Sequence, residues 1–214
     1  MRKVVPSVLT NDPKELERKI RILEQLTDTI QIDIMDGELV PNTSIKANDV
    51  RKINTSAKLE MHLMVRNPIE YIEPYADTIA FRIIFHIESD DNPEDLINEI
   101  VKSKMKPGIA INPPTPVERI MPYLDMIDIA LVMGVNPGFQ GQKFIPDVLS
   151  KVRKIKNKRQ ELLIEVDGGV NPETVPDLIS SGVDILNVGS YLFKDDNVEN
   201  NWKQMQHIIN QSSS

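Results

Sequence analysis

Residues 126–133 read MIDIALVM, and residues 127–132 within them form a nearly continuous apolar run. A strand with apolar residues at consecutive positions is buried on both faces, which is typical of a parallel sheet covered by helices. Seven further short apolar or β-branched runs recur along the chain. The predicted strands span residues 4–9, 29–33, 58–64, 82–86, 106–111, 126–133, 163–166 and 185–188.

Charged segments with helical spacing separate these strands. Several begin with Asp or Asn followed by Pro, as in Asp12-Pro13 and Asn92-Pro93. This pair is a helix start signal, because the first side chain caps the helix and Pro has no N–H to lose in the first turn. The predicted helices span residues 13–26, 45–53, 68–75, 93–103, 116–123, 146–159, 174–181 and 198–209.

Eight strands that alternate with eight helices predict a parallel sheet with crossover helices. An open, doubly wound sheet is the alternative, but its first turn is often rich in Gly, whereas residues 9–12 read LTND. We therefore predict an α/β fold, a closed (β/α)8 TIM barrel that occupies residues 1–214 as a single domain. The active site of such a barrel lies at the C-terminal ends of its strands.

The composition excludes several classes of function. The formal net charge is −7, which disfavours binding to nucleic acid or to anionic membranes, and no run approaches the roughly 20 apolar residues of a membrane span. The chain has no Cys, so disulfides, thiolate metal sites and a Cys nucleophile are excluded, and we expect a cytoplasmic location. A small anionic substrate is compatible with this charge, because backbone amides can hold a phosphate.

Two carboxylates lie at predicted strand ends. Asp33 follows the second strand in IDIMDG (residues 32–37), and Asp167 follows the seventh in EVDGG (residues 165–169). In an eight-strand barrel, the second and seventh strands lie closer to opposite each other than to side by side. The two carboxylates can therefore flank a bound substrate. That arrangement suits a two-base epimerisation, in which one group removes a proton and the other returns one from the opposite side. Either Asp alone could instead cap the turn that follows it.

Only three histidines are available for chemistry. His62 lies in the third strand, and with Asp33 and Asp167 it could bind Zn, Mn or Fe, since imidazole and carboxylate suit these metals. The alternative for His62 is a hydrogen-bonded histidine of the core. His86 is expected to be structural or to support a neighbouring ligand, and His207 is expected at the surface.

Five of the nine glycines in the chain gather in three short segments that follow the last three strands, residues 136–142, 168–169 and 189–190. Gly lets backbone N–H groups approach an anion closely, and barrels typically hold phosphate after the seventh and eighth strands. Ordinary turn formation is the alternative. The glycines are Gly138 and Gly141 in NPGFQGQ (residues 136–142), Gly168 and Gly169, and Gly189, which precedes Ser190.

Several short blocks occur in order along nearly the whole chain. They are PSVL (6–9), DIMDG (33–37), VPN (40–42), MHLMV (61–65), VNPGF (135–139), GQKF (141–144), VDGG (166–169) and VGS (188–190). Together they resemble the ribulose-phosphate 3-epimerase family. The resemblance implies a (β/α)8 barrel that interconverts D-ribulose 5-phosphate and D-xylulose 5-phosphate in the pentose phosphate pathway.

The resemblance also implies roles for individual residues. It makes Asp33 and Asp167 the catalytic acid/base pair as well as metal ligands, with His62 as a third ligand that also contacts substrate. The other residues implied to contact substrate or its phosphate are Ser7, Gly138, Gln140, Gly141, Gly168, Gly169, Gly189 and Ser190.

Three positions depart from the family pattern. Gln31 stands where the family usually has a His that supplies a fourth metal ligand, and an amide oxygen is a weaker ligand for zinc or iron. Gln140 replaces a Gly of the phosphate loop, and Glu38 replaces a His that commonly follows the Asp-Gly pair. We therefore expect a divalent ion, Zn, Fe or Mn, that binds more weakly than in four-ligand relatives.

Loss of the proton next to the substrate ketone gives an enediolate, whose developing charge a divalent cation would stabilise.

One alternative is a sibling epimerase that acts on a six-carbon ketose phosphate of the allulose 6-phosphate type. Decarboxylase and aldolase relatives fit less well, because their Asp-x-Lys-x-x-Asp pattern is absent and Met35 stands in the Lys position. A third alternative is a non-catalytic phosphosugar-binding barrel. The expected partners are a small phosphosugar and further copies of the chain, without nucleic acid or membrane.

Overall fold

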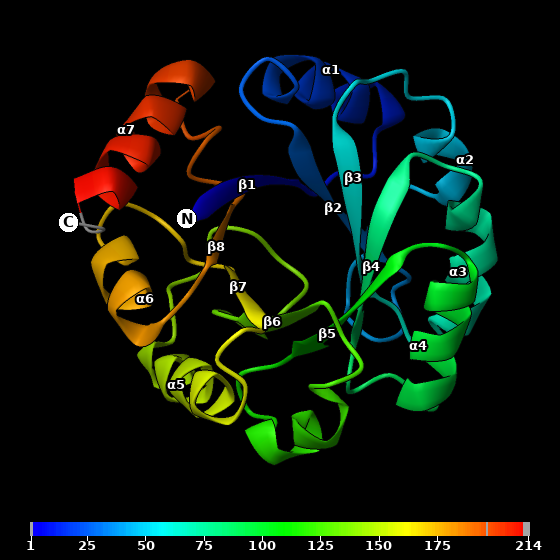
Figure 1. Ribbon diagram of the computed structural model, residues 1–214. Coiled ribbons are helices and arrows are strands. Elements are labelled where there is room, and N and C mark those ends of the chain that lie inside the picture. The colour runs from blue at the N-terminus through cyan, green and yellow to red at the C-terminus, as the bar shows by residue number, and fades with distance from the viewer. Residues whose placement is uncertain (1, 196, 212–214) are drawn as a thin grey trace.

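The computed structural model describes residues 2–195 and 197–211, and its eight strands close into one parallel barrel in the order β1 to β8 (Figure 1). Each strand pairs with the next along the chain, and β1 pairs with β8. The predicted (β/α)8 TIM barrel is therefore confirmed. The strands are β1 (Lys3–Val8), β2 (Thr29–Met35), β3 (Lys58–Met64), β4 (Ala80–His86), β5 (Lys106–Ile111), β6 (Ile129–Met133), β7 (Leu163–Asp167) and β8 (Ile185–Val188).

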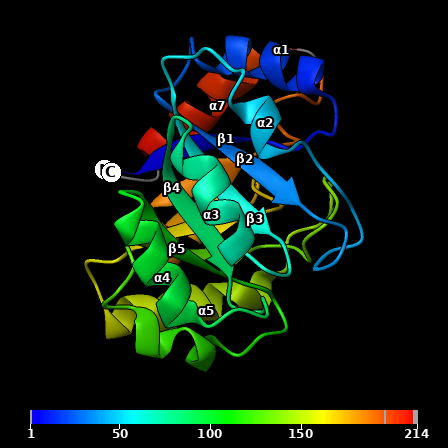
Figure 2. The same cartoon turned by 90° about the vertical axis from the view of Figure 1, so that its right-hand side faces the viewer.

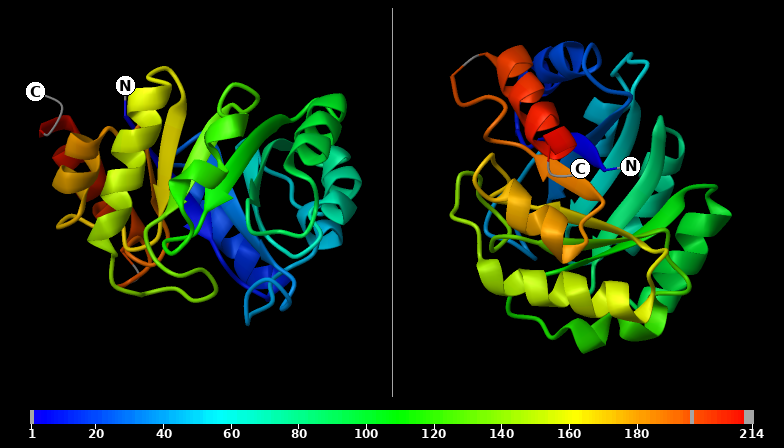
Figure 3. Two further views of the ribbon diagram at one scale, coloured as in Figure 1. Left: turned by 90° about the horizontal axis from the view of Figure 1, so that it is seen from below. Right: turned by 60° about the vertical axis from the view of Figure 1, so that its left-hand side comes forward.

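Helices surround the barrel on its outside, as Figures 1 and 2 show from two directions and Figure 3 from two more. The cap-then-Pro signal is confirmed at two helix starts, where the side chains of Asp12 and Asn92 accept hydrogen bonds from backbone N–H groups of the first turn. None of the helices within the described ranges has the length and apolar character to cross a membrane. The helices are α1 (Pro13–Leu23), α2 (Ala47–Val50), α3 (Ile69–Ala76), α4 (Pro93–Lys102), α5 (Leu149–Lys158), α6 (Val175–Ser181) and α7 (Val198–Gln211).

The structure corrects the helix predicted over residues 116–123. Two short 3-10 helices, η1 (Val117–Arg119) and η2 (Met121–Tyr123), stand there instead. Pro122 within η2 has no N–H, so a continuous α-helical ladder cannot pass through it. A third 3-10 helix, η3 (Pro146–Val148), leads directly into α5, so the helix predicted over residues 146–159 begins with a 3-10 turn.

The bounds of β1, β2, β4, β6 and β7 also differ from the prediction, by one to three residues. Strand β6 begins at Ile129 rather than at residue 126, because Asp128 precedes the ladder and its carboxylate accepts hydrogen bonds from Arg82 and Lys106. Strand β2 continues to Met35, so Asp33 lies inside the strand, where it pairs in register with His62 of β3.

The strands carry both apolar and polar buried side chains. Outside the strands, a large apolar core fills the space between the strands and the helices. Inside, a smaller apolar cluster comes mainly from β4, β5 and β6: Val5, Ile84, Ala110, Ile129, Leu131, Met133 and Ile185. The buried polar residues on the strands are Ser7, Gln31, Asp33, Glu60, His62, Arg82, His86, Glu165, Asp167 and Asn187.

The buried carboxylate of Glu60 lies next to the guanidinium of Arg82. Arg82 also donates to Asp128 at 2.6 Å, and Lys106 donates to the other oxygen of Asp128 at 2.8 Å. A buried charge is tolerated when it is paired in this way, and removal of one partner leaves a costly unpaired charge. The ion cluster therefore ties β3, β4 and the start of β6 together.

Candidate active site

Asp33 and Asp167 come together through the side chain of Gln31. Alternation along β2 points both Gln31 and Asp33 into the barrel. The Nε2 atom of Gln31 donates to Oδ1 of Asp33 at 2.8 Å and to Oδ2 of Asp167 at 3.0 Å. The side chains of Asp33 and Asp167 are 8% and 12% exposed, so they are nearly buried yet reach the surface of a pocket.

His62 lies against both carboxylates. Its Nδ1 atom is 3.0 Å from Oδ1 of Asp33 and 3.4 Å from Oδ2 of Asp167, and the ring is fully buried. Burial lowers the pKa of His62, but the hydrogen bonds to Asp167 and Asp33 outweigh burial and raise it to about 9. Burial, together with the neighbouring charge of Asp167, raises the pKa of Asp33. The cluster therefore holds two carboxylates close together with a proton on or near the imidazole.

The same three residues fit a divalent cation. One donor atom each from Asp33, His62 and Asp167 lie within 4.8 Å of one another, and all three side chains are buried. Two carboxylates and one imidazole form a donor set that suits Zn, Mn or Fe. The amide nitrogen of Gln31 faces this set, whereas its Oε1 atom is buried without a hydrogen-bond partner. A half-turn of this amide would bring the unpartnered oxygen towards the three donors as a fourth ligand.

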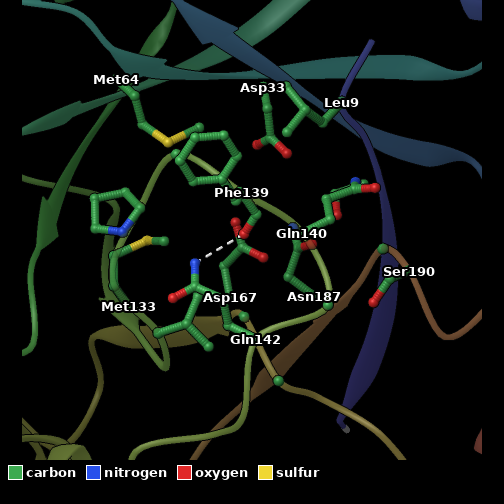
Figure 4. A pocket seen from close by; sticks show the side chains of 18 of the residues that line it. Leu9, Asp33, Met64, Met133, Phe139, Gln140, Gln142, Asp167, Asn187 and Ser190 are labelled. Atoms are coloured by element: carbon green, nitrogen blue, oxygen red, sulfur yellow. Dashed lines mark hydrogen bonds between the residues drawn. The ribbon is translucent and has the colours of Figure 1, made fainter. Parts of the chain in front are cut away.

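A pocket opens above the two carboxylates (Figure 4). The methionines Met64 and Met133 lie on one side of it and Ser190 lies on the other. His62 contacts both aspartates and is fully buried, and it is absent from the described lining. The described lining holds no Lys, Arg or His. The other predicted substrate contacts all line the pocket: Ser7, Gly138, Gln140, Gly141, Gly168, Gly169, Gly189 and Ser190.

A Cβ atom would be crowded at two glycine positions of this wall. Gly168 has φ +99°, and a Cβ built there would lie 2.5 Å from Cγ2 of Val135. A Cβ at Gly189 would lie 2.8 Å from Oγ of Ser7 and 3.4 Å from Nε2 of Gln140. The backbone is therefore bare where the pocket wall is formed. Backbone N–H groups at such positions can hold anions without a cationic side chain.

Two features of the site escaped the sequence analysis. Asn187 lines the pocket from β8, and its Nδ2 atom donates to Oε1 of Glu165 at 2.9 Å. Its position two residues before Gly189 places it on the inward face of β8, which is a signal that sequence inspection could have used. The second feature is a contact between His62 and His86, whose Nε2 atoms lie 2.9 Å apart. His207 is exposed on α7, as predicted.

Comparison with known proteins agrees with this geometry. Residues 3–193 match the model of the ribulose-phosphate 3 epimerase family. The chain is 41% identical to the ribulose-phosphate 3-epimerase, cytoplasmic isoform, of Oryza sativa subsp. japonica over 89% of this chain and 87% of the rice protein. It is 40% identical to the ribulose-phosphate 3-epimerase of Bacillus subtilis over 90% of this chain and 93% of that protein.

Solved structures with low sequence identity share the fold. A mutant tryptophan synthase alpha-subunit from Pyrococcus furiosus superposes with a TM-score of 0.74 at 16% identity, over 98% of this chain and 100% of that chain. A thiamine phosphate pyrophosphorylase from Pyrococcus furiosus gives a TM-score of 0.65 at 14% identity, over 100% of this chain and 97% of that chain. At this identity the likeness concerns the barrel alone.

Proposed function

The chain belongs to the ribulose-phosphate 3-epimerase family, and we propose that it interconverts D-ribulose 5-phosphate and D-xylulose 5-phosphate by two-base proton transfer. It is an isomerase of the epimerase kind. The observation that carries the two-base proposal is the meeting of Asp33 and Asp167 at the floor of one pocket, bridged by Gln31. Two carboxylates in one pocket can serve the two faces of a planar intermediate.

In the proposed reaction, Asp33 removes the proton from the carbon next to the substrate ketone. The electron pair left on that carbon delocalises onto the ketone oxygen and gives an enediolate. Asp167, which must enter the reaction in its protonated form, then delivers its proton to the same carbon from the opposite face. This inverts the configuration and leaves Asp33 protonated and Asp167 ionised, ready for the reverse reaction. The raised pKa of Asp33 suits this role, because a base whose pKa lies closer to the working pH transfers protons more readily in both directions.

A divalent cation is the proposed cofactor, and Asp33, His62 and Asp167 would hold it. When bound, such an ion supplies Lewis acidity that stabilises negative charge developing on substrate oxygens. Gln31 supplies an amide where a fourth strong ligand would stand, so we expect the ion to bind weakly, to be lost during purification and to be restored by added Zn²⁺, Mn²⁺ or Fe²⁺.

The phosphate is proposed to bind at the bare backbone of the three glycine-bearing loops. The glycines after β6, β7 and β8 line the pocket together with Ser7 and Ser190. In this proposal the backbone N–H groups of these loops and the two hydroxyl groups donate hydrogen bonds to the phosphate. Because the described lining carries no cationic side chain, recognition of the phosphate would rest on hydrogen bonds. Phosphate binding far from the reacting carbon holds that carbon between the carboxylates.

The test is an assay of purified protein on ribulose 5-phosphate, with metal analysis of the same sample. We expect formation of xylulose 5-phosphate and a higher rate after addition of a divalent ion. Allulose 6-phosphate serves as the competing substrate, and a higher kcat/KM for it would replace the five-carbon assignment with the six-carbon one. Absence of turnover on both sugars, with and without metal, would support the non-catalytic binding barrel instead.

Two further expectations belong to this proposal. A cytoplasmic location agrees with the name of the rice relative, and fractionation of cells would test it. Assembly into a homo-oligomer is also expected, and light scattering of the purified protein would measure it.

A further inference from the structure

His86 lies against His62 on the edge of the ring that faces away from the two aspartates. The two Nε2 atoms are 2.9 Å apart, the ring planes differ by 18°, and both side chains are fully buried. Two ring nitrogens at this distance form a hydrogen bond only when one of them carries a proton and the other offers a lone pair. The direction of this one bond therefore decides whether Nδ1 of His62, the nitrogen that faces Asp33 and Asp167, carries the proton of the neutral ring.

Glu88 determines that direction. Its Oε2 atom lies 3.2 Å from Nδ1 of His86, and its Oε1 atom accepts a hydrogen bond from the backbone N–H of Asn112 at 3.0 Å. A carboxylate only accepts, so the proton of neutral His86 stands on Nδ1. Nε2 of His86 is then the acceptor, and Nε2–H of His62 is the donor. In the neutral ring, the Nδ1 atom of His62 then keeps a lone pair that faces the aspartates.

We propose that Glu88 and His86 are positioning residues that fix the tautomer of His62 and so reserve its Nδ1 atom for the divalent cation. The inference rests on the proposed function for the presence of that cation. A metal-bound imidazole commonly donates its other N–H to a neighbouring group, which fixes the ring and raises its basicity as a ligand. Here the acceptor is a second imidazole, which is itself oriented by a carboxylate. Neither Glu88 nor His86 is among the described residues that line the pocket.

The loop that carries this support is held from outside the barrel. Nζ of Lys151 on α5 donates to the carbonyl oxygens of Asn112 and Pro113, each at 2.7 Å. Arg119 donates to the carbonyl oxygen of Ile87, the residue between His86 and Glu88, at 2.8 Å. These contacts hold the backbone around Asn112, whose N–H group fixes the Glu88 carboxylate. Residues on α5 and η1 therefore help to orient the carboxylate that orients His86.

The first test needs no mutation. NMR of metal-free wild-type protein with 15N-labelled histidine distinguishes protonated from unprotonated ring nitrogens. We expect His86 to carry its proton on Nδ1 and to have an unprotonated Nε2. A spectrum in which His86 carries its proton on Nε2 would overturn the inference.

The second test is Glu88→Gln, which should reverse the hydrogen bonds. The backbone N–H of Asn112 needs an acceptor, so the new amide keeps its oxygen there and turns its NH2 group towards Nδ1 of His86. His86 then carries its proton on Nε2 and donates to His62, whose own proton moves to Nδ1. We expect Zn²⁺ to bind about 10–100-fold more weakly, measured by calorimetry on chelator-treated protein.

Glu118→Gln is the matched control, because Glu118 lies exposed on η1 and pairs only with Lys154 among the described salt bridges. Equal Zn²⁺ affinity of the Glu88→Gln and Glu118→Gln proteins would overturn the inference. The proposed function would still stand if the wild-type protein shows epimerase activity. If wild-type protein turns over no sugar phosphate, the proposed function fails, and the NMR and Zn²⁺ measurements still decide the inference. Should Glu88→Gln not fold, the wild-type spectrum decides it alone.

Discussion

Replacement of Asp33 or Asp167, the two proposed acid/base groups, by asparagine separates the two halves of the proposed reaction. Asn is nearly isosteric with Asp, and its Oδ1 atom can still accept the hydrogen bonds from Gln31, which are 2.8 Å long at Asp33 and 3.0 Å long at Asp167. The fold should therefore survive either substitution. Asn cannot take up and release a proton at that position, and it also removes a charged donor to the proposed divalent cation.

The expected loss is large. Acid/base groups contribute about 10²–10⁴-fold to turnover, which corresponds to about 3–5 kcal/mol of activation free energy at 1.36 kcal/mol per tenfold change. Asp33→Asn and Asp167→Asn should each lower kcat by at least this factor, with a smaller effect on KM. Asp177→Asn, an exposed change of the same kind on α6, should leave kcat unchanged.

Hydrogen exchange in D2O distinguishes the two carboxylates. Each variant retains one carboxylate, which still faces one side of the substrate carbon and can exchange the proton there without inversion. We expect each variant to incorporate deuterium into one of the two pentulose phosphates only, and the two variants to differ in which one. Exchange of the same epimer by both variants, or kcat within about tenfold of wild type in either, would refute the two-base reasoning.

Three further predictions follow from the site. Gly189→Val should raise KM more than it lowers kcat, because even a Cβ there lies 2.8 Å from Oγ of Ser7; equal turnover of dephosphorylated sugar by wild type would contradict the phosphate site. Gln31→His should tighten Zn²⁺ binding in a chelator competition, and unchanged affinity would refute the ligand position. In metal-free protein, the raised pKa of His62 should add to the free energy of unfolding measured with urea. This contribution should be fully present below pH 6.5 and should be lost as the pH rises through about 9. The difference between these two pKa values corresponds to on the order of 3 kcal/mol, and His62→Asn should remove this pH dependence.

The sequence alone was sufficient for the barrel and for most of the pocket wall. Strand and helix periodicities are local properties, so the alternation of β-strands and helices could be recognised without a structure. Because parallel strands present their C-terminal ends at one rim, Asp33, Asp167 and the glycines after β6, β7 and β8 could be assigned to one site. The prediction failed at residues 116–123, because it followed the helical spacing and overlooked that Pro122 cannot donate to the hydrogen-bond ladder of an α-helix.

Only the closed structure decided which side chains meet inside the barrel. Gln31 and Asp167 are 136 residues apart in the chain, and closure of β1 against β8 brings them to 3.0 Å. The contact of His62 with His86 depends on the register of β3 with β4. The hydrogen bond between Glu88 and His86 depends on the loop after β5, which fixes the Glu88 carboxylate. The periodicity of a strand fixes the face to which a side chain points, but its partner across the barrel depends on closure, register and backbone groups that no local pattern encodes.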